Sequence, residues 1–161
     1  MQQAKYHVHV YDKDKNRLKL LNRLKNLSFD ESPCEISRQC DLIFICVDKT
    51  ENVENVVFGE NGIVQNASKK TIIVDLSTTS ADKTIIFSKN LKLKKRSSWI
   101  DAPVSGGPSK ALDGSLAIMM GGDKAKIKQI QIVLETLSSN FTHFGPVGSG
   151  QIVKMINQIL V

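Results

Sequence analysis

The sequence lacks the features that mark membrane and secreted proteins. No apolar run approaches the roughly 20 residues that a membrane-spanning helix needs. The first residues carry neither the apolar stretch of a secretory signal nor the arginine-rich and serine-rich character of a transit peptide. With 161 residues, of which 41% are hydrophobic, the chain has the size and composition of one globular domain. We therefore expect a single domain in the cytoplasm with no membrane partner.

Cysteine is scarce and irregularly spaced. Cys34, Cys40 and Cys46 are odd in number and form no C-x-x-C pair. They therefore indicate neither a disulfide framework nor a zinc site, and we expect free thiols in a reducing compartment. The three histidines also show no metal-ligand spacing, so no bound metal is expected.

The positive charge is not organised as it is in most nucleic-acid-binding proteins. The formal net charge is +6, but the lysines are spread through the chain. The one basic cluster, residues 89–96, has no interleaved aromatic residues. We interpret it as a solvated face and expect no nucleic-acid partner, although a basic nucleic-acid-binding module stays the weakest of the alternatives.

Strand-like and helix-like segments alternate along the chain. Such alternation predicts an α/β fold with a doubly wound, mostly parallel sheet. Helical spacing is present in Leu18, Leu21, Leu24 and Leu27, in Val53, Val56 and Val57, and across residues 123–137. The expected strands are residues 5–11, 42–47, 71–76, 99–104, 115–120 and 142–144.

Polar or glycine-rich motifs follow four of the expected strands. They are Asp12, Val47-Asp48, Ser77-Thr78 and Ser105-Gly106-Gly107. In open parallel sheets, ligands bind at the carboxyl ends of the strands, so these motifs indicate a ligand site at that edge. Two simpler interpretations stay open, because Thr78 can be a helix N-cap and Asp12 can begin the next helix.

Two further motifs together favour the binding and protonation of a hydroxy acid. Asp101-Ala-Pro-Val-Ser-Gly-Gly107 ends in adjacent glycines, whose backbone N–H groups can approach a carboxylate closely, with the Ser105 hydroxyl as another donor. Gly148-Ser-Gly-Gln-Ile-Val-Lys154-Met-Ile-Asn157 begins as a turn and becomes helical. Lys154 and Asn157, three residues apart, then share one helix face.

With these motifs in place, the chain resembles the β-hydroxyacid dehydrogenase family, which contains 3-hydroxyisobutyrate dehydrogenase and 2-hydroxy-3-oxopropionate reductase. The resemblance covers nearly the whole sequence and depends on the order and spacing of several motifs. Besides the two long motifs quoted above, they are Val10-Tyr-Asp12, Gly59-Glu-Asn-Gly62, Asp75-Leu-Ser-Thr78, and Gly114-Ser-Leu with Gly121-Gly122.

The resemblance implies a Rossmann-type fold and a hydride transfer between a nicotinamide cofactor and a small β-hydroxy acid or its semialdehyde. Lys154 would then be the proton donor and acceptor, and Asn157 would orient the substrate. Ser105, Gly106 and Gly107 would hold the substrate carboxylate. Because the segment after Lys154 lacks the histidine of the 6-phosphogluconate dehydrogenases, a small acid is expected rather than a phosphosugar.

The resemblance also implies a cofactor pocket lined by Val47 and Asp48, with Thr78 at the nicotinamide half. Relatives often have proline where Asp48 stands. Asp12 can accept hydrogen bonds from the ribose hydroxyls and would repel a 2′-phosphate, which favours NAD. Lys13 beside it leaves NADP open.

Two departures from the family pattern stand out. The family begins with a strand and a G-x-G-x-x-G turn, whereas this chain starts after that element, so we expect a sheet that lacks its first strand and has two unpaired edges or a gap. We expect residues 1–147 to be a partial dinucleotide-binding domain and residues 148–161 to begin an interdomain helix. The helical domain that makes family members homo-oligomers is not expected here. A non-catalytic remnant or interaction module of the same fold is the alternative.

Overall fold

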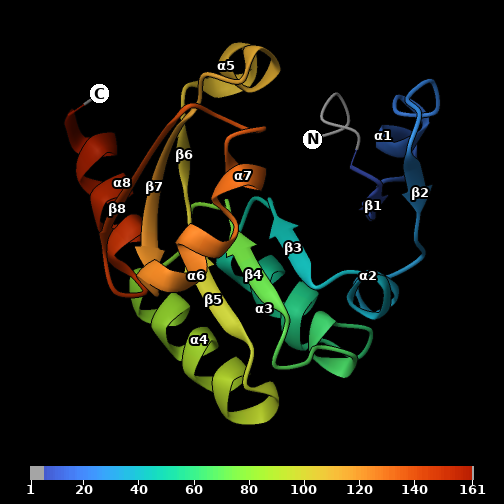
Figure 1. Ribbon diagram of the computed structural model, residues 1–161, viewed down its shortest axis with the longest axis horizontal. Coiled ribbons are helices and arrows are strands. Elements are labelled where there is room, and N and C mark those ends of the chain that lie inside the picture. The colour runs from blue at the N-terminus through green and yellow to red at the C-terminus, as the bar shows by residue number, and fades with distance from the viewer. Residues whose placement is uncertain (1–5, 161) are drawn as a thin grey trace.

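The computed structural model describes residues 6–160, which form a six-stranded sheet with helices on both faces and a separate two-stranded sheet beside it (Figure 1). The strands are β1 Val8–Val10, β2 Leu27–Phe29, β3 Leu42–Ile45, β4 Ile72–Asp75, β5 Ser98–Asp101, β6 Val104–Ser105, β7 Ala117–Gly122 and β8 Asn140–Gly145. The helices are α1 Lys15–Lys19, α2 Pro33–Gln39, α3 Thr50–Phe58, α4 Ala81–Lys95, α5 Gly107–Asp113, α6 Lys124–Gln129, α7 Gln131–Leu134 and α8 Ser149–Leu160, with a short 3-10 helix, η2, at Ile63–Gln65.

The larger sheet is mostly parallel, as the alternation of segments predicts. Strands β3, β4 and β5 pair in parallel, and β8 pairs in parallel with β7. Strand β7 runs antiparallel to both β5 and β6. The register places Ile45 beside Asp75 and Asp75 beside Asp101, so the carboxyl ends of β3, β4 and β5 lie level with one another.

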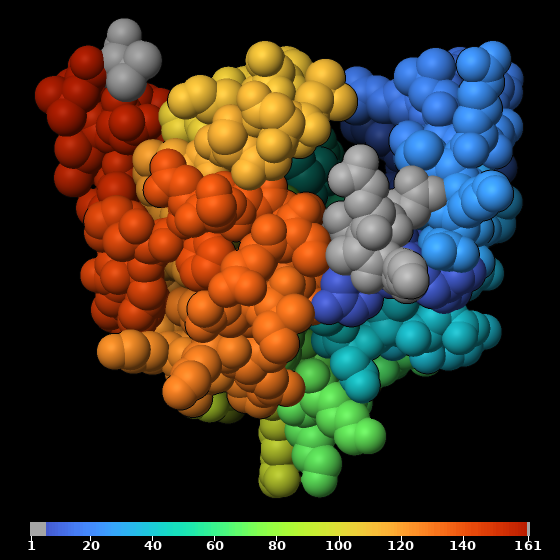
Figure 2. Space-filling view, turned by 45° about the horizontal axis from the view of Figure 1, so that its top comes forward, coloured from blue at the N-terminus to red at the C-terminus, as the bar shows by residue number. Residues whose placement is uncertain are grey.

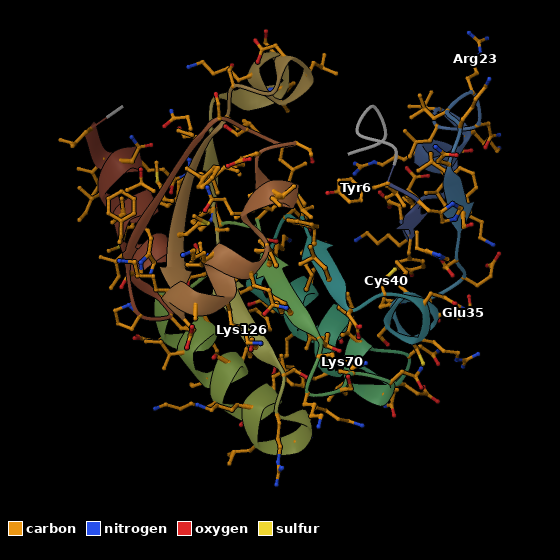
Figure 3. The ribbon with its side chains drawn as sticks, in the orientation of Figure 1. Tyr6, Arg23, Glu35, Cys40, Lys70 and Lys126 are labelled. Atoms are coloured by element: carbon orange, nitrogen blue, oxygen red, sulfur yellow. The ribbon has the colours of Figure 1, made fainter. Side chains whose placement is uncertain are left out.

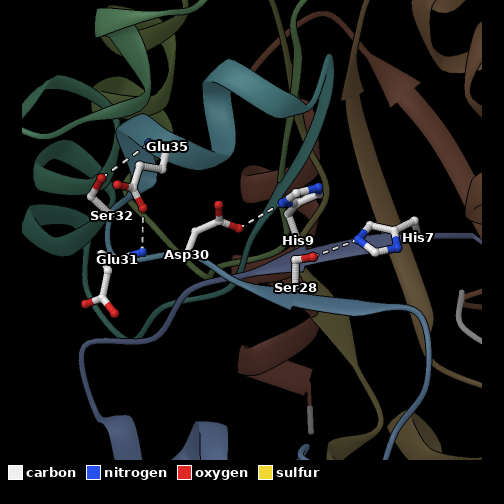
Figure 4. A network of polar contacts seen from close by, with 7 residues as sticks. All are labelled: His7, His9, Ser28, Asp30, Glu31, Ser32 and Glu35. Atoms are coloured by element: carbon white, nitrogen blue, oxygen red, sulfur yellow. Dashed lines mark hydrogen bonds and ion pairs between the residues drawn. The ribbon is translucent and has the colours of Figure 1, made fainter.

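Strands β1 and β2 pair in parallel with each other and with no strand of the larger sheet. Polar contacts support this small sheet: His7 Nε2 lies 2.8 Å from Ser28 Oγ, and His9 Nδ1 lies 2.9 Å from Asp30 Oδ2 (Figure 4). Within residues 6–160 no strand pairs with both β1 and β3 to join the two sheets. The expectation of an interrupted sheet is therefore confirmed for the described part of the chain.

Two apolar cores cover the two faces of the larger sheet. One joins the sheet to α3 and α4 and includes Val57, Leu91 and Trp99, whose ring centroid lies 6.0 Å from that of Phe87. The other joins the sheet to α6 and α7 and includes Ile100, Ile127 and Leu134. No helix of the described residues is both long and apolar enough to cross a bilayer.

The prediction of a helix that continues through Leu27 is wrong. Helix α1 ends at Lys19, and Leu27 begins β2. Leu24 is 47% exposed, so a longer helix would gain little stability from packing against a core. Asn26 has a φ of 57° and turns the chain into β2. The helix expected over residues 123–137 is likewise divided into α6 and α7 at Ile130.

Candidate active site at the carboxyl edge of the sheet

The start of α8 is fixed to the end of β5 by a buried carboxylate. Asp101 Oδ1 accepts a hydrogen bond from the backbone N–H of Gly148 at 2.8 Å, and Oδ2 accepts one from Gln151 at 3.0 Å. Burial raises the pKa of Asp101, and these backbone hydrogen bonds oppose the rise. A carboxylate beside the first N–H groups of a helix satisfies donors that the helix itself leaves unpaired.

The buried side chain of Gln151 extends this connection to the loop after β4. Its Oε1 accepts from the Thr79 N–H at 3.0 Å, and its Nε2 donates to the Ser77 carbonyl at 2.8 Å. Ser77 Oγ in turn accepts from the Val47 N–H at 3.0 Å. The loops that follow β3 and β4 are therefore held in one hydrogen-bonded network with the first turn of α8.

Asp75 lies beneath the same network. It is fully buried, and its Oδ1 accepts from the Ser77 N–H at 3.0 Å, while Oδ2 has no hydrogen-bond partner. Burial raises its pKa to about 6, and the nearby charge of Asp101 acts in the same direction. The hydrogen bonds from Ser77 oppose the rise.

Helix α8 brings Asn157 of the long C-terminal motif to the Ser-Gly-Gly turn. Ser105 Oγ donates to Asn157 Oδ1 at 3.2 Å. Lys154 lies one turn earlier on the same helix face and is only 9% exposed. A mostly buried lysine is uncommon in proteins and is more often functional than a solvated one. The structure thus joins segments that are about fifty residues apart in the sequence.

The Ser-Gly-Gly turn has a backbone that glycine adopts readily. Gly106 and Gly107 have φ values of 134° and 70°, and nothing lies within 4 Å of the position that a Gly107 side chain would take. The backbone beside Gly107 is therefore open to a ligand. A side chain at Gly106 would meet Lys110 Cδ at 2.6 Å, so the exposed Lys110 lies over this turn.

An apolar cavity of about 350 Å³ adjoins the turn. Gly107 belongs to both the turn and the cavity wall, and a volume of this size suits a small organic ligand. In the space-filling view, dark teal atoms are visible in a recess beside the yellow-orange α5 (Figure 2). The other wall residues are Cys46, Leu76, Val104, Pro108, Ala111, Leu116, Ile118 and Leu137.

The residues expected on the cofactor side lie after β1, β3 and β4. Thr78 is exposed, and the cap of α4 is Ser80, whose side chain accepts from the Lys83 N–H, so Thr78 is not the helix N-cap. Val47 is half-buried, and Asp48 is exposed with its Oδ1 bonded to Asn52 Nδ2.

Asp12 is half-buried after β1. Its Oδ1 accepts from the N–H of Asp14, and Asp14 is the N-cap of α1. Asp12 Oδ2 lies 3.8 Å from Arg17 Nη1. Asp12 therefore supports the start of the next helix and retains lone pairs for another donor, so the two roles considered for it are compatible.

The basic cluster does not belong to this site. Lys89, Lys92 and Arg96 line a shallow hollow with Leu93 near the end of α4. Helix α4 begins at the carboxyl edge and rises roughly 20 Å over its length, so the cluster lies toward the opposite edge of the sheet. Elsewhere the positive charge is dispersed, as the labelled Arg23, Lys70 and Lys126 show (Figure 3). Among residues 6–160, no group of His, Cys, Asp and Glu side chains could hold a metal.

Four residues of the site had no assigned role in the sequence analysis. Asp75, Asp101 and Gln151 position α8 and its neighbouring loops, and Lys110 lies over Gly106. Acidic residues that end apolar strands were a usable signal for the two aspartates. No sequence signal identifies Gln151, because the partners of its side chain are more than seventy residues away.

Comparisons with known proteins agree with this architecture. Residues 1–145 match the family model described as the NAD binding domain of 6-phosphogluconate dehydrogenase. The 2-hydroxy-3-oxopropionate reductase of Escherichia coli is 40% identical over 131 residues, which are 81% of this chain and 44% of that protein. A probable mitochondrial 3-hydroxyisobutyrate dehydrogenase of Dictyostelium discoideum is 32% identical over 94% of this chain and 47% of that protein.

Solved structures share the fold. That of Mycobacterium tuberculosis 3-hydroxyisobutyrate dehydrogenase with L-serine superposes with a TM-score of 0.89 at 24% identity, covering 98% of this chain and 53% of that one. The chain thus spans about half the length of the relatives it matches. It belongs to the β-hydroxyacid dehydrogenase family, and its residues correspond to the N-terminal, Rossmann-type domain of that family.

Proposed function

We propose that this chain is part of an oxidoreductase that transfers a hydride between a nicotinamide cofactor and a small β-hydroxy acid or its semialdehyde. The observation that carries the proposal is the hydrogen bond between Ser105 and Asn157. It supports the proposal because Asn157 and the buried Lys154, three residues apart on α8, share a helix face, and the amides of the Ser-Gly-Gly turn are open at Gly107. An anion-binding turn beside a proton donor is what the reduction of a carbonyl acid requires.

The substrate carboxylate accepts hydrogen bonds from the N–H groups of Gly106 and Gly107 and from the Ser105 hydroxyl. Asn157 orients the hydroxyl-bearing part of the acid, and Lys154 gives its proton to the oxygen that becomes the alcohol. In the oxidative direction Lys154 takes that proton back. The apolar cavity beside Gly107 accepts the carbon skeleton of the acid.

Val47, Asp48, Thr78 and Asp12 suit a nicotinamide cofactor bound along the carboxyl edge. Such a cofactor supplies or accepts the hydride when it is bound. Thr78 is exposed and is not the N-cap of α4. Asp12 is half-buried and can still accept a hydrogen bond from a ribose hydroxyl. A carboxylate at this position favours NAD. Arg17 beside it offers a positive charge to a 2′-phosphate, so NADP is the second candidate.

Residues 1–147 would hold the cofactor side, and residues 148–161 would begin the helix that leads to a second domain. Two features of α8 support this division. One side of the helix contacts β5 and β7. Another side carries an exposed apolar stripe that a second domain could cover. Ile152, Met155, Ile156 and Ile159 are all at least 45% exposed on it.

Binding of a family substrate tests the substrate half of this proposal. Titration of the isotope-labelled chain with 3-hydroxyisobutyrate should shift the amide resonances of Gly106, Gly107 and Asn157. Ser105→Ala should weaken the binding about ten-fold, since it removes one hydrogen bond to a charged group. The matched control Ser109→Ala, on the exposed side of α5, should leave it unchanged. Shifts confined to residues away from Ser105 would contradict the assignment.

The cofactor half needs a separate measurement. Isothermal titration with NADH and NADPH should show binding, with NADH the tighter of the two. A folded chain that binds 3-hydroxyisobutyrate but neither nucleotide would favour the non-catalytic alternative. The unjoined edges of β1 and β3 are the structural observation that favours that alternative.

A further inference from the structure

The outer surface of α4 near its C-terminal end carries an exposed leucine among cations. Lys89, Lys92, Leu93 and Arg96 line a shallow hollow of about 670 Å³. Leu93 is 83% exposed, and Ile86, two helical turns earlier, is 49% exposed. Residues seven apart in a helix share one face, so these two apolar side chains and Lys89 between them form one stripe. We call the surface lined by the first four residues the α4 hollow.

The cations of the α4 hollow have no acidic partner among the described residues. No acidic residue occurs between Asp82, in the first turn of α4, and Asp101, at the end of β5. The ion pairs of residues 6–160 involve no cation of the hollow. Lys95 differs from these cations, because it is half-buried and its Nζ donates to the Gln65 carbonyl at 3.2 Å. The charges of the hollow are therefore available to an external anion.

Stabilisation of the helix end explains only part of this pattern. Cations in the last turn interact favourably with the C-terminal end of the helix dipole, which accounts for Lys92. Lys89 lies more than one turn before α4 ends at Lys95, beyond the reach of that effect. Arg96 follows with a left-handed φ of 56°, a conformation in which helix ends usually have glycine. A cation kept in this conformation indicates a use for its charge.

The surface around the hollow does not suit a nucleic acid. Base stacking needs exposed aromatic rings, but the aromatic residues of α4 and β5, Phe87 and Trp99, are both buried. A duplex would present its phosphate groups to the cations and would leave Leu93 against a charged backbone. The apolar component of the hollow would then have no partner.

A lipid bilayer also fits poorly. Helices that lie on bilayers have a continuous apolar face opposite a polar one. The only large apolar residues of α4 that are exposed are Ile86 and Leu93, and the helix has no such face. A concave surface also receives a protruding side chain more readily than a flat layer of headgroups.

An acidic peptide segment that contains an apolar residue matches both components of the hollow. Its carboxylates would pair with Lys89, Lys92 and Arg96, and an arginine can hold a carboxylate through two N–H groups. An apolar side chain between these carboxylates would cover Leu93 and the methylene groups of the two lysines. Charge and shape then favour the same occupant.

We infer that the α4 hollow is a docking site for an acidic segment of a partner protein, anchored by one large apolar side chain. The hollow lies at the opposite end of α4 from Ser80, which caps the helix at the carboxyl edge of the sheet. The inference is therefore independent of the proposed catalytic function.

Fluorescence anisotropy with a defined peptide tests the inference. The probe is a fluorescein-labelled peptide with a central leucine and four glutamates on either side. The control peptide has serine in place of the leucine and therefore the same charge. The 161-residue chain should bind the leucine peptide at least ten-fold more tightly than the serine peptide, because only the leucine removes apolar surface from water.

Variants of exposed residues locate the binding surface without disturbing the core. Leu93→Ser should weaken binding of the leucine peptide about ten-fold and leave binding of the serine peptide unchanged. Arg96→Gly should weaken binding of both peptides about three-fold, and it should keep the fold because glycine is favoured at this φ. The matched control Lys83→Gln removes the same charge from the first turn of α4 and should change neither affinity.

Three results would overturn the inference. The leucine peptide could fail to bind the folded chain. The two peptides could bind equally, or Lys83→Gln could weaken binding as much as Arg96→Gly, and either outcome would show attraction by net charge alone. Duplex DNA, or a vesicle of phosphatidylcholine and phosphatidylserine, could bind more tightly than the leucine peptide and be weakened by the same variants. The hollow would then bind a nucleic acid or a lipid surface.

Discussion

At the scale of single residues, the buried acids of the carboxyl edge combine structural and electrostatic roles. Asp101 uses both oxygens to hold α8, whereas Asp75 leaves Oδ2 without a partner. Burial without full hydrogen bonding favours the protonated form of a carboxyl group. Asp75 therefore titrates close to neutral pH, with a pKa of about 6, and its charge state affects the stability of the site.

Replacement of Asp75 should reveal how much its ionisation lowers the free energy of unfolding. The folded-state pKa of about 6 lies above the ordinary 3.8, so the native chain binds more protons in this interval and stability falls as pH rises through it. Asp75→Asn removes the ionisation. Relative to the parent, the variant should gain roughly 2 kcal/mol more at pH 7.5 than at pH 4.5, as measured by urea unfolding. An equal gain for Asp82→Asn, at an exposed position in α4, would contradict the explanation.

Lys110 is expected to contribute to recognition of an anionic substrate, because its side chain lies over Gly106. Its exposure limits the effect, since solvent screens a charge at the surface. Lys110→Met should raise the dissociation constant for 3-hydroxyisobutyrate about three-fold. Lys89→Met removes the same charge from the distant end of α4 and should not change that constant. If both variants weaken binding equally, only the net charge matters.

At the scale of elements, α8 depends on a residue that lies outside the helix. Asp101→Asn leaves one good acceptor where the carboxylate has two, so the Gly148 or Gln151 N–H should lose its partner. We expect a loss of roughly 2 kcal/mol in the free energy of unfolding, with faster amide exchange in α8 than in β4.

Asp123→Asn is the matched control for this change, because Asp123 also accepts from two backbone N–H groups at a helix start. Asparagine is a good N-cap, so this variant should be nearly neutral. Uniformly faster exchange across α8 and β4 in Asp101→Asn would show general destabilisation rather than release of the helix.

The elements that the sequence predicted well are those with strong local patterns. The apolar runs before Val47 and Leu76 became β3 and β4, and the Gly-x-Gly turn became the start of α8. Short elements were missed, among them β2, α2 and α5, because three to seven residues carry too little periodicity. The family motifs located the Ser105 and Asn157 pair, but long-range contacts such as those of Gln151 become visible only in the folded chain.

At the scale of the whole molecule, the two sheets should differ in stability. The β1–β2 sheet has only three residue pairs, and both Phe29 within it and Leu24 just before β2 are at least 43% exposed. The larger sheet is enclosed by two cores. Local opening requires the least free energy where few apolar contacts are lost.

Hydrogen exchange measured by mass spectrometry should therefore show peptides from residues 8–29 exchanging before those from residues 72–75 and 98–101. The expected separation is at least ten-fold in rate, which corresponds to a difference of about 1.4 kcal/mol in opening free energy. Simultaneous exchange of both regions would mean that the two sheets unfold as one cooperative unit.

Trp99 makes the larger sheet optically accessible. It is the only tryptophan of the chain, is 3% exposed, and packs against Phe87 in the core beneath α3 and α4. Its fluorescence therefore reports on that core and does not respond to local opening of the β1–β2 sheet. Disagreement between tryptophan emission and circular dichroism during unfolding would expose a partly folded species without any added label.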